Sequence, residues 1–243
     1  MCTVTVIPLG DGIRMACNRD ESPLRPAALP PRVLTWGTRR GLAPLDPLSG
    51  GTWIGVNDAA LVGTLLNIYD APRIGVPPAQ KRSRGIILPL LLACASLDKA
   101  MDLASGLDAN DFADFRLVLA DRRRIASVRC ARHRLDVGAI ESINGPMLFT
   151  SSGLGDAVVD PPRRALFGEM LRPPADLVSA QDAYHRHAWP DRLHLSVCMR
   201  RPEARTMSLT VIQTDAAQAR MRYHAAPPDQ PAAWTEDCFS SFS

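Results

Sequence analysis

The sequence has 243 residues, of which 46% are hydrophobic and 22% charged, and its formal net charge is +3. This length and composition predict a single globular domain over residues 1–243 with a hydrophobic core of its own. The small net charge and the scattered arginines argue against a nucleic-acid-binding protein, which usually carries a continuous basic surface.

The chain begins with a predicted β-hairpin. Residues 3–7 are β-branched and apolar, turn residues occupy 8–12, and a second apolar run covers 13–17. The four polar residues 18–21 that follow are, taken alone, typical of a turn. The Pro-rich residues 22–32 predict an irregular loop.

A second hairpin is predicted from Trp53 to Leu66, with Asn57-Asp58 at its turn and Asn67 at its end. The polar, Pro-rich residues 70–82 predict a loop. Ser83 and Ser96 are suitable N-caps for two helices that run to Leu92 and Leu103, the first of them kinked or delayed by a proline.

The rest of the chain alternates between strand and helix patterns. Strands are predicted over 115–120, 125–128 and 147–151, helices over 163–171 and 179–187, and a last hairpin over 207–214 and 219–224, while the Ala/Pro-rich tail 225–243 is expected to be irregular. Groups of strands that alternate with groups of helices predict an α+β fold of two antiparallel sheets covered by helices.

Targeting signals and metal motifs are not expected. The N-terminal residues lack the basic and long apolar regions of a secretory signal, and the most apolar run, 86–95, is shorter than the about 20 residues of a membrane span. We therefore expect a cytoplasmic protein without an integral membrane segment. None of the six cysteines has C-x-x-C spacing, so no metal site is predicted.

Cys2 is the first candidate for chemistry. Removal of Met1, which aminopeptidases perform when the next side chain is small, would leave Cys2 with both a thiol and a free α-amine. Such an amine titrates near 7.7–8.0 and can accept the thiol proton at neutral pH, so one residue supplies nucleophile and base. The alternative is a small residue at the start of an edge strand.

The polar run Asn18-Arg19-Asp20-Glu21 is the second candidate. If residues 2–7 pair with the strand that precedes this run, Asp20 can hold the α-ammonium of Cys2 and Arg19 can favour its thiolate. The alternative is the ordinary turn already described.

The start Met-Cys-Thr, followed by Asn-Arg-Asp-Glu at residues 18–21, resembles the NRDE family, also called the transport and Golgi organisation 2 family. Residues 51–57 with the later Leu65-Leu66-Asn67 are similar to that family's second hairpin. Residues 83–85 resemble its first helix start, and residues 150–152 with Arg163 and Phe167 resemble a later passage from strand to helix. The resemblance extends from residue 1 to about residue 224.

The resemblance implies a place in the N-terminal-nucleophile hydrolase superfamily, near the choloylglycine and penicillin-V acylases, and hence a four-layer αββα sandwich. It implies Cys2 as the nucleophile, Asn18 and Asp20 as the residues that orient its amine and thiol, and Asn67 as an oxyanion donor. The acylases usually place a second asparagine after a later strand. Here Ser151 and Ser152 stand in that neighbourhood.

Two functions follow from the resemblance. One is a hydrolase that needs no cofactor and cleaves a non-peptide amide or a thioester of a small-molecule acyl substrate through an acyl-enzyme. The other is a non-catalytic protein that binds and carries haem, a lipid or acyl-CoA in an apolar pocket on the same fold. His185 and His187 are possible metal or haem ligands, although their predicted place near a helix end favours a structural role.

Overall fold

The computed structural model describes residues 2–69 and 81–240. Within them, the elements in chain order are β1 (Cys2–Leu9), β2 (Gly12–Glu21), β3 (Leu29–Trp36), β4 (Arg39–Leu45), β5 (Ile54–Asn57), β6 (Val62–Asn67), the 3₁₀ helix η1 (Arg84–Ile86), α1 (Ile87–Leu91), α2 (Leu97–Ser105), β7 (Phe115–Ala120), β8 (Arg124–Ala131), β9 (Arg134–Val137), β10 (Glu141–Ser142), β11 (Met147–Ser151), α3 (Asp156–Met170), α4 (Leu177–Arg186), β12 (Arg205–Thr214), β13 (Gln218–His224) and β14 (Trp234–Ser240).

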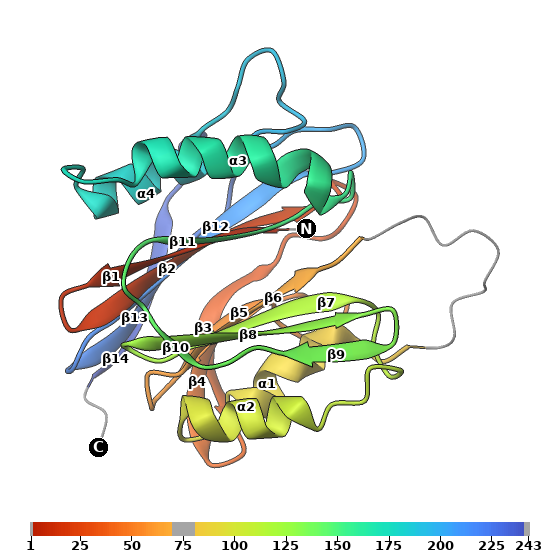
Figure 1. Cartoon of the computed structure of the whole chain (residues 1–243), viewed down its shortest axis with the longest axis vertical. Coiled ribbons are helices and arrows are strands. Elements are labelled where there is room, and N and C mark those ends of the chain that lie inside the picture. The colour runs from red at the N-terminus through yellow and green to blue at the C-terminus, as the bar shows by residue number, and fades with distance from the viewer. Residues whose placement is uncertain (1, 70–80, 241–243) are drawn as a thin grey trace.

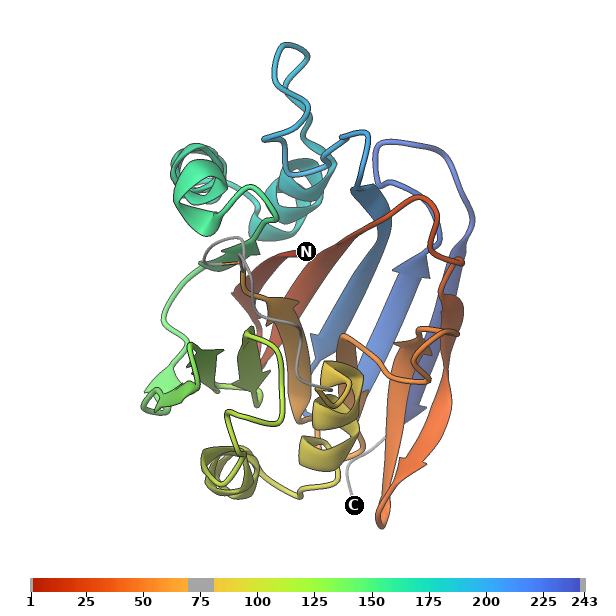
Figure 2. The ribbon, with the colours of Figure 1, turned by 90° about the vertical axis from the view of Figure 1, so that its right-hand side faces the viewer.

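The strands form two antiparallel sheets. The first has the order β11-β1-β2-β12-β13-β14, and the second has the order β10-β8-β7-β6-β5-β4-β3 with β9 paired to β8. Figure 1 shows the sheets stacked face to face, with α3 and α4 over the first and α1 and α2 over the second. Figure 2 shows the same stack after a quarter turn. The predicted αββα arrangement of four layers is therefore confirmed.

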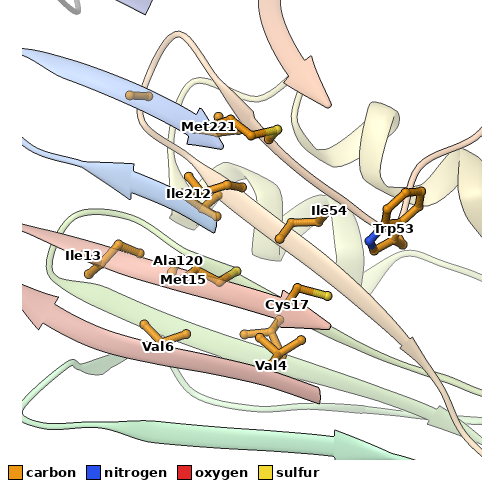
Figure 3. Close-up of a cluster of buried hydrophobic side chains, with 14 of the residues drawn as sticks. Val4, Val6, Ile13, Met15, Cys17, Trp53, Ile54, Ala120, Ile212 and Met221 are labelled. Carbon is orange, nitrogen blue, oxygen red and sulfur yellow. The ribbon is translucent and has the colours of Figure 1, made fainter. Parts of the chain in front are cut away.

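Successive residues of a strand point to opposite faces of its sheet, so each sheet contributes apolar side chains both to the space between the sheets and to the space under its helices. Three separate hydrophobic layers result. Val4 and Val6 of β1 point between the sheets, where they join Ile13 and Met15 of β2 and Ile54 of β5 (Figure 3). Further apolar clusters fill the space between the second sheet and α1 and α2, and between the first sheet and α3 and α4.

Most predicted hairpins and helices are present with small shifts of their ends. Ser96 caps α2 as expected, because its hydroxyl accepts a hydrogen bond from the Lys99 amide at 3.3 Å. Ser83 also acts as a cap, but the single helix predicted after it is divided into η1 and α1. Of the loop predicted over 70–82, residues 70–80 lie outside the described part of the chain.

Of the two interpretations of the polar run 18–21, the turn is excluded, because these residues are the end of β2 and are held between β1 and β12. Three predictions were wrong at least in part because tertiary contacts overrode the local signal. The tail contains β14, which pairs with β13 and places Phe239 in the core between the sheets. Of the loop predicted over 22–32, residues 29–32 instead belong to β3. Helix α3 begins at Asp156 rather than at 163 and includes two prolines, each of which removes one backbone donor.

Among the described residues, none of the helices combines the length and the apolar character that crossing a membrane requires.

Candidate active site

A cavity of about 340 Å³ opens where β1 begins and β2 ends. Four of the five residues singled out from the sequence line it: Cys2, Arg19, Asp20 and Asn67. Cys2, Arg19 and Asp20 come from the first sheet, whereas Asn67 ends β6 of the second sheet. The fold therefore brings together residues that are separated by about a quarter of the sequence.

Cys2 is the first residue of β1 and is almost completely buried, with 4% of its surface exposed. It lies opposite Arg19 of β2 on one side and opposite Ser151 of β11 on the other. Its strand is thus an interior strand of the sheet and not the edge strand of the alternative interpretation. Cys2 belongs to the core between the sheets and also lines the cavity.

A second cysteine, Cys17, changes the pKa of Cys2. Cys17, two residues before Arg19 on β2, points to the same side of the sheet as Cys2 and is fully buried (Figure 3 shows Cys17 at this end of the core). A hydrogen bond with the Cys17 thiol lowers the pKa of Cys2, and the positive charge of Arg19 has a small effect in the same direction, while burial and the negative charge of Asp20 raise it. The same interaction and burial raise the pKa of Cys17 well above its usual range. Cys2 is therefore the thiol of this pair that ionises first.

Arg19 is fixed in the cavity wall by two contacts. Its Nη2 atom lies 2.8 Å from Asp46 Oδ2, and its guanidinium carbon lies 4.5 Å from the centroid of the Trp53 ring. Asp46 also accepts a hydrogen bond from Arg25 Nε at 2.7 Å. Burial opposes ionisation of Asp46, but Arg25 and two backbone amides lower its pKa, so it remains a carboxylate that holds both arginines.

Asp20 is buried beside the start of β12. Its Oδ1 atom accepts a hydrogen bond from the Thr206 hydroxyl at 2.7 Å. Burial raises its pKa, and the positive charges of Arg163 and Arg201 and the Thr206 bond partly offset that effect. Arg163 belongs to α3. Its guanidinium donates hydrogen bonds to Thr3 Oγ1 at 2.8 Å and to the carbonyl oxygens of Leu195 and Ser196 at 2.9 Å and 2.6 Å.

Asn18, which the resemblance implies as a residue that orients Cys2, is not among the residues that line the cavity. Successive residues of a strand point to opposite faces, and Asn18 lies on the face that packs against α4. Its Nδ2 donates to the carbonyl oxygens of His185 and Val197 at 2.9 Å and 3.0 Å, and its Oδ1 lies 3.0 Å from His185 Nδ1. Asn18 thus anchors β2 to the helical layer.

The candidate oxyanion donors differ in their surroundings. Asn67 lines the cavity and donates through Nδ2 to the hydroxyl of Tyr69 at 3.1 Å. The buried hydroxyl of Ser151, opposite Cys2, has no hydrogen-bond partner among the described residues. The hydroxyl of Ser152 accepts a hydrogen bond from Arg201 Nη2 at 2.8 Å.

The two histidines considered as ligands lie away from this cavity's wall. His185, in the last turn of α4, is fully buried between Thr5 and Asn18, and burial lowers its pKa to about 3. It is therefore a neutral structural histidine. The described part of the chain contains no group of three or more histidine, cysteine or acidic side chains arranged to hold a metal ion.

Sequence reasoning did not identify several residues of the cavity wall as site residues, among them Trp53, Asp46 and Arg84. Trp53 and Arg84 belong to two of the motifs on which the family resemblance rests. That resemblance was the only feature of the sequence that could have marked them as site residues. Nothing in the local sequence around Asp46 indicated that two arginines converge on it.

Comparisons with known proteins show the family and the fold. The sequence profile of the Transport and Golgi organisation 2 family matches residues 13–162. No curated protein matches the chain in sequence.

Two of the solved structures that resemble this chain cover nearly all of it. One is a Caenorhabditis elegans ortholog of N-acylethanolamine-hydrolyzing acid amidase, with a TM-score of 0.56, 14% identity, and coverage of 95% of this chain and 94% of that one. The other is a cysteine-to-alanine variant of the conjugated bile acid hydrolase from Clostridium perfringens, with a TM-score of 0.55, 13% identity, and coverage of 98% and 92%. At such identities the likeness concerns the fold, which is that of the N-terminal-nucleophile hydrolases.

Proposed function

This chain belongs to the Transport and Golgi organisation 2 family, and we propose that it is an N-terminal-cysteine hydrolase that cleaves a non-peptide amide or a thioester through an acyl-enzyme. The observation that carries the proposal is the place of Cys2: it begins an interior strand, lines a cavity, and lies beside Arg19 and a thiol donor. Amide hydrolases among the structural neighbours share the fold.

The reaction starts with removal of Met1, which gives Cys2 a free α-amine. The amine takes the proton of the thiol as the sulfur attacks the carbonyl carbon of the substrate, and the carbonyl electrons move to oxygen. Collapse of this intermediate expels the leaving amine or thiol, which receives the proton from the α-ammonium. Water then attacks the thioester of Cys2, and the free acid and the free thiol are released.

The surrounding residues have separate tasks in this reaction. Asp20 lies in the cavity wall with its Oδ1 bound to Thr206, and its negative charge stabilises the α-ammonium. Asn67 is the side-chain donor for the oxyanion, a role that is worth about 2.7–4 kcal/mol in other hydrolases. Arg19 favours the thiolate of Cys2 by its charge. Asn18 contributes only by fixing the position of β2.

The lining of the cavity favours a hydrolase over a carrier of bulky apolar ligands. Eight of its lining residues are charged: Arg19, Asp20, Glu21, Arg25, Asp46, Lys81, Arg82 and Arg84. A haem or lipid carrier would instead bury its ligand against apolar and aromatic side chains. We therefore favour a hydrolase over a protein that binds haem or lipid.

The test is the acylation of Cys2 by an activated ester. Purified wild-type protein is treated with 4-nitrophenyl acetate, and nitrophenolate release is compared with the intact mass before and after reaction. We expect protein without Met1, a stoichiometric burst, and an acetyl group on the Cys2 peptide. Cys2→Ala should give no burst, whereas Cys238→Ala, which removes an exposed cysteine, should retain it. Retention of Met1, or a burst that survives Cys2→Ala, would refute the mechanism.

A further inference from the structure

The cavity has two unlike walls. The wall from the first sheet contains the nucleophile and its neighbours, and the other contains residues 81–85, which lead into η1 and include its first two residues. This second wall carries three cations, Lys81, Arg82 and Arg84. Whether they are already neutralised within the protein decides whether they are available to a substrate.

Most cations around the cavity have carboxylate partners. Arg19 and Arg25 converge on the same Asp46 oxygen, Oδ2, at 2.8 Å and 2.7 Å. The Nη1 atom of Arg82 lies 3.1 Å from Asp111 Oδ2, and its side chain is largely exposed. The charges of these three arginines are therefore balanced by the protein or screened by water.

Arg84 and Lys81 differ because the acceptors that the described residues offer them are uncharged carbonyl oxygens. Arg84 Nη1 donates to the carbonyl oxygen of Asp114 at 2.7 Å, and Lys81 Nζ donates to the carbonyl oxygens of Asn110 and Phe112 at 2.9 Å and 3.1 Å. No carboxylate among the described residues lies within ion-pair distance of either cation. Carbonyl groups orient these side chains without cancelling their charges.

Arg84 is also removed from water to a large extent. It is only partly exposed, and burial lowers its pKa, although the more distant charges of Tyr69, Asp114 and Glu21 act in the opposite direction. A desolvated cation without a counter-ion costs free energy, and an anion that enters the cavity would regain part of it. A guanidinium also binds carboxylate and phosphate groups through two parallel hydrogen bonds.

Close backbone packing fixes Arg84 at the cavity. Gly51 and Gly85 touch so closely that a Cβ atom on Gly51 would lie 2.6 Å from Gly85 Cα. The Gly85 carbonyl oxygen also accepts a hydrogen bond from the Thr52 amide at 3.3 Å. Because Thr52 and Trp53 line the same cavity, this contact sets the position of Arg84 relative to the wall that carries Cys2.

We infer that Arg84, assisted by Lys81, binds an anionic group of the substrate, so that the enzyme acts on acyl compounds that carry a carboxylate or a phosphate away from the scissile carbonyl. The inference rests on the proposed hydrolase function and narrows its substrate class. It assigns Arg84 a role in specificity, because Arg84 touches the substrate but not the reacting atoms.

A matched pair of esters tests the inference. The 4-nitrophenyl monoester of succinate and 4-nitrophenyl butyrate have acyl chains of equal length, but only the first carries a carboxylate. We expect wild-type Cys2 to be acylated at least about tenfold faster by the succinyl ester, since one charge-assisted contact is worth about that factor. Arg84→Gln should collapse this ratio towards one, and Lys81→Gln should reduce it less.

The control is Arg82→Gln, which removes a cation of the same segment that already has Asp111 as its partner, and it should leave the ratio as it is in the wild type. Equal rates for the two esters in the wild type, or a ratio that Arg84→Gln does not change, would overturn the inference. The butyryl rate and a thermal melt of each variant show whether that variant has folded.

Direct binding separates this inference from the proposed mechanism. In the Cys2→Ala protein, calorimetry measures binding of a succinate monoamide and of the matching butyramide. Tighter binding of the succinate monoamide that is lost in Cys2→Ala/Arg84→Gln supports the anion site even if wild-type Cys2 is never acylated, which would refute only the hydrolase. Equal binding of the two amides would refute the anion site even if Cys2 is acylated.

Discussion

Replacement of Cys17 by alanine is expected to weaken Cys2 as a nucleophile. The Cys17 thiol donates a hydrogen bond that lowers the pKa of Cys2, and Cys17 remains protonated because its own pKa is raised. A hydrogen bond to a charged acceptor is worth about 1.5–3 kcal/mol. Both sulfurs are buried, so water does not readily replace the lost donor. At 1.36 kcal/mol per tenfold change, Cys2 should have about 10- to 100-fold less thiolate at neutral pH.

The assay is alkylation of the Cys2 peptide by iodoacetamide, followed by mass spectrometry across a pH series. In Cys17→Ala the rate should rise only at a higher pH than in the wild type, and in Cys17→Ser, which keeps a donor, the change should be smaller. Cys130→Ala, which removes a buried thiol from the other apolar cluster, should behave as the wild type. A pH profile for Cys17→Ala that coincides with the wild-type profile would refute the reasoning.

Three further predictions concern the residues that hold the site in place. Arg163→Met should lower the free energy of unfolding in urea by about 3–5 kcal/mol, because it leaves buried acceptors and Asp20 without their cation; a loss below about 1 kcal/mol would contradict this. Gly51→Ala should cost about 1–3 kcal/mol and slow the acylation of Cys2, because its Cβ meets Gly85, whereas Gly145→Ala, which has open space, should change stability by less than about 0.5 kcal/mol. His185 has a folded pKa of about 3, below its unfolded value of 6.5, so its contribution to stability is complete above pH 6.5 and is lost as the pH falls towards 3. Between pH 6.5 and 4.5 this loss should be about 2–3 kcal/mol in the wild type. The free energy of unfolding of His185→Gln, measured in urea, should fall over the same pH range by about 2–3 kcal/mol less than that of the wild type.

Elements with a strong local signal could be predicted from the sequence. The hairpin built from β5 and β6 follows from its apolar strands and its Asn57-Asp58 turn, and α2 follows from its Ser96 cap. In each case the chain folds onto its own neighbours, so that the determining contacts are close in sequence.

Elements that depend on distant partners could not be predicted. The polar run at the end of β2 has a turn composition, but Asn18 and Arg19 are strand residues because β1 and β12 supply backbone partners on both sides. β14 follows a Pro-rich segment and depends on β13 and on the burial of Phe239. In such cases the local secondary-structure propensity does not decide the structure, because burial and strand pairing contribute more free energy than the conformational preference of a single residue.

The resemblance grouped Cys2, Asp20 and Asn67 as site residues, and the local sequence added Arg19. All four line one cavity. The resemblance also grouped Asn18 with Asp20. The two residues have the same place in the alternation of β2, but Asp20 lies near the end of the strand, where the cavity opens, whereas Asn18 is bound by His185 of α4.

Strand alternation on β2 divides the motif into two tasks. Cys17 and Arg19 share the face that carries Cys2 and adjust its charge state, whereas Asn18 binds His185 on α4 and holds the strand in place. Substitutions on the first face should therefore change the pH dependence of Cys2. Asn18→Ala should lower stability and leave that pH dependence unchanged, because it leaves the buried carbonyls of His185 and Val197 without a donor. A variant of Asn18 that melts as the wild type but has an altered pH profile would show that this division is wrong.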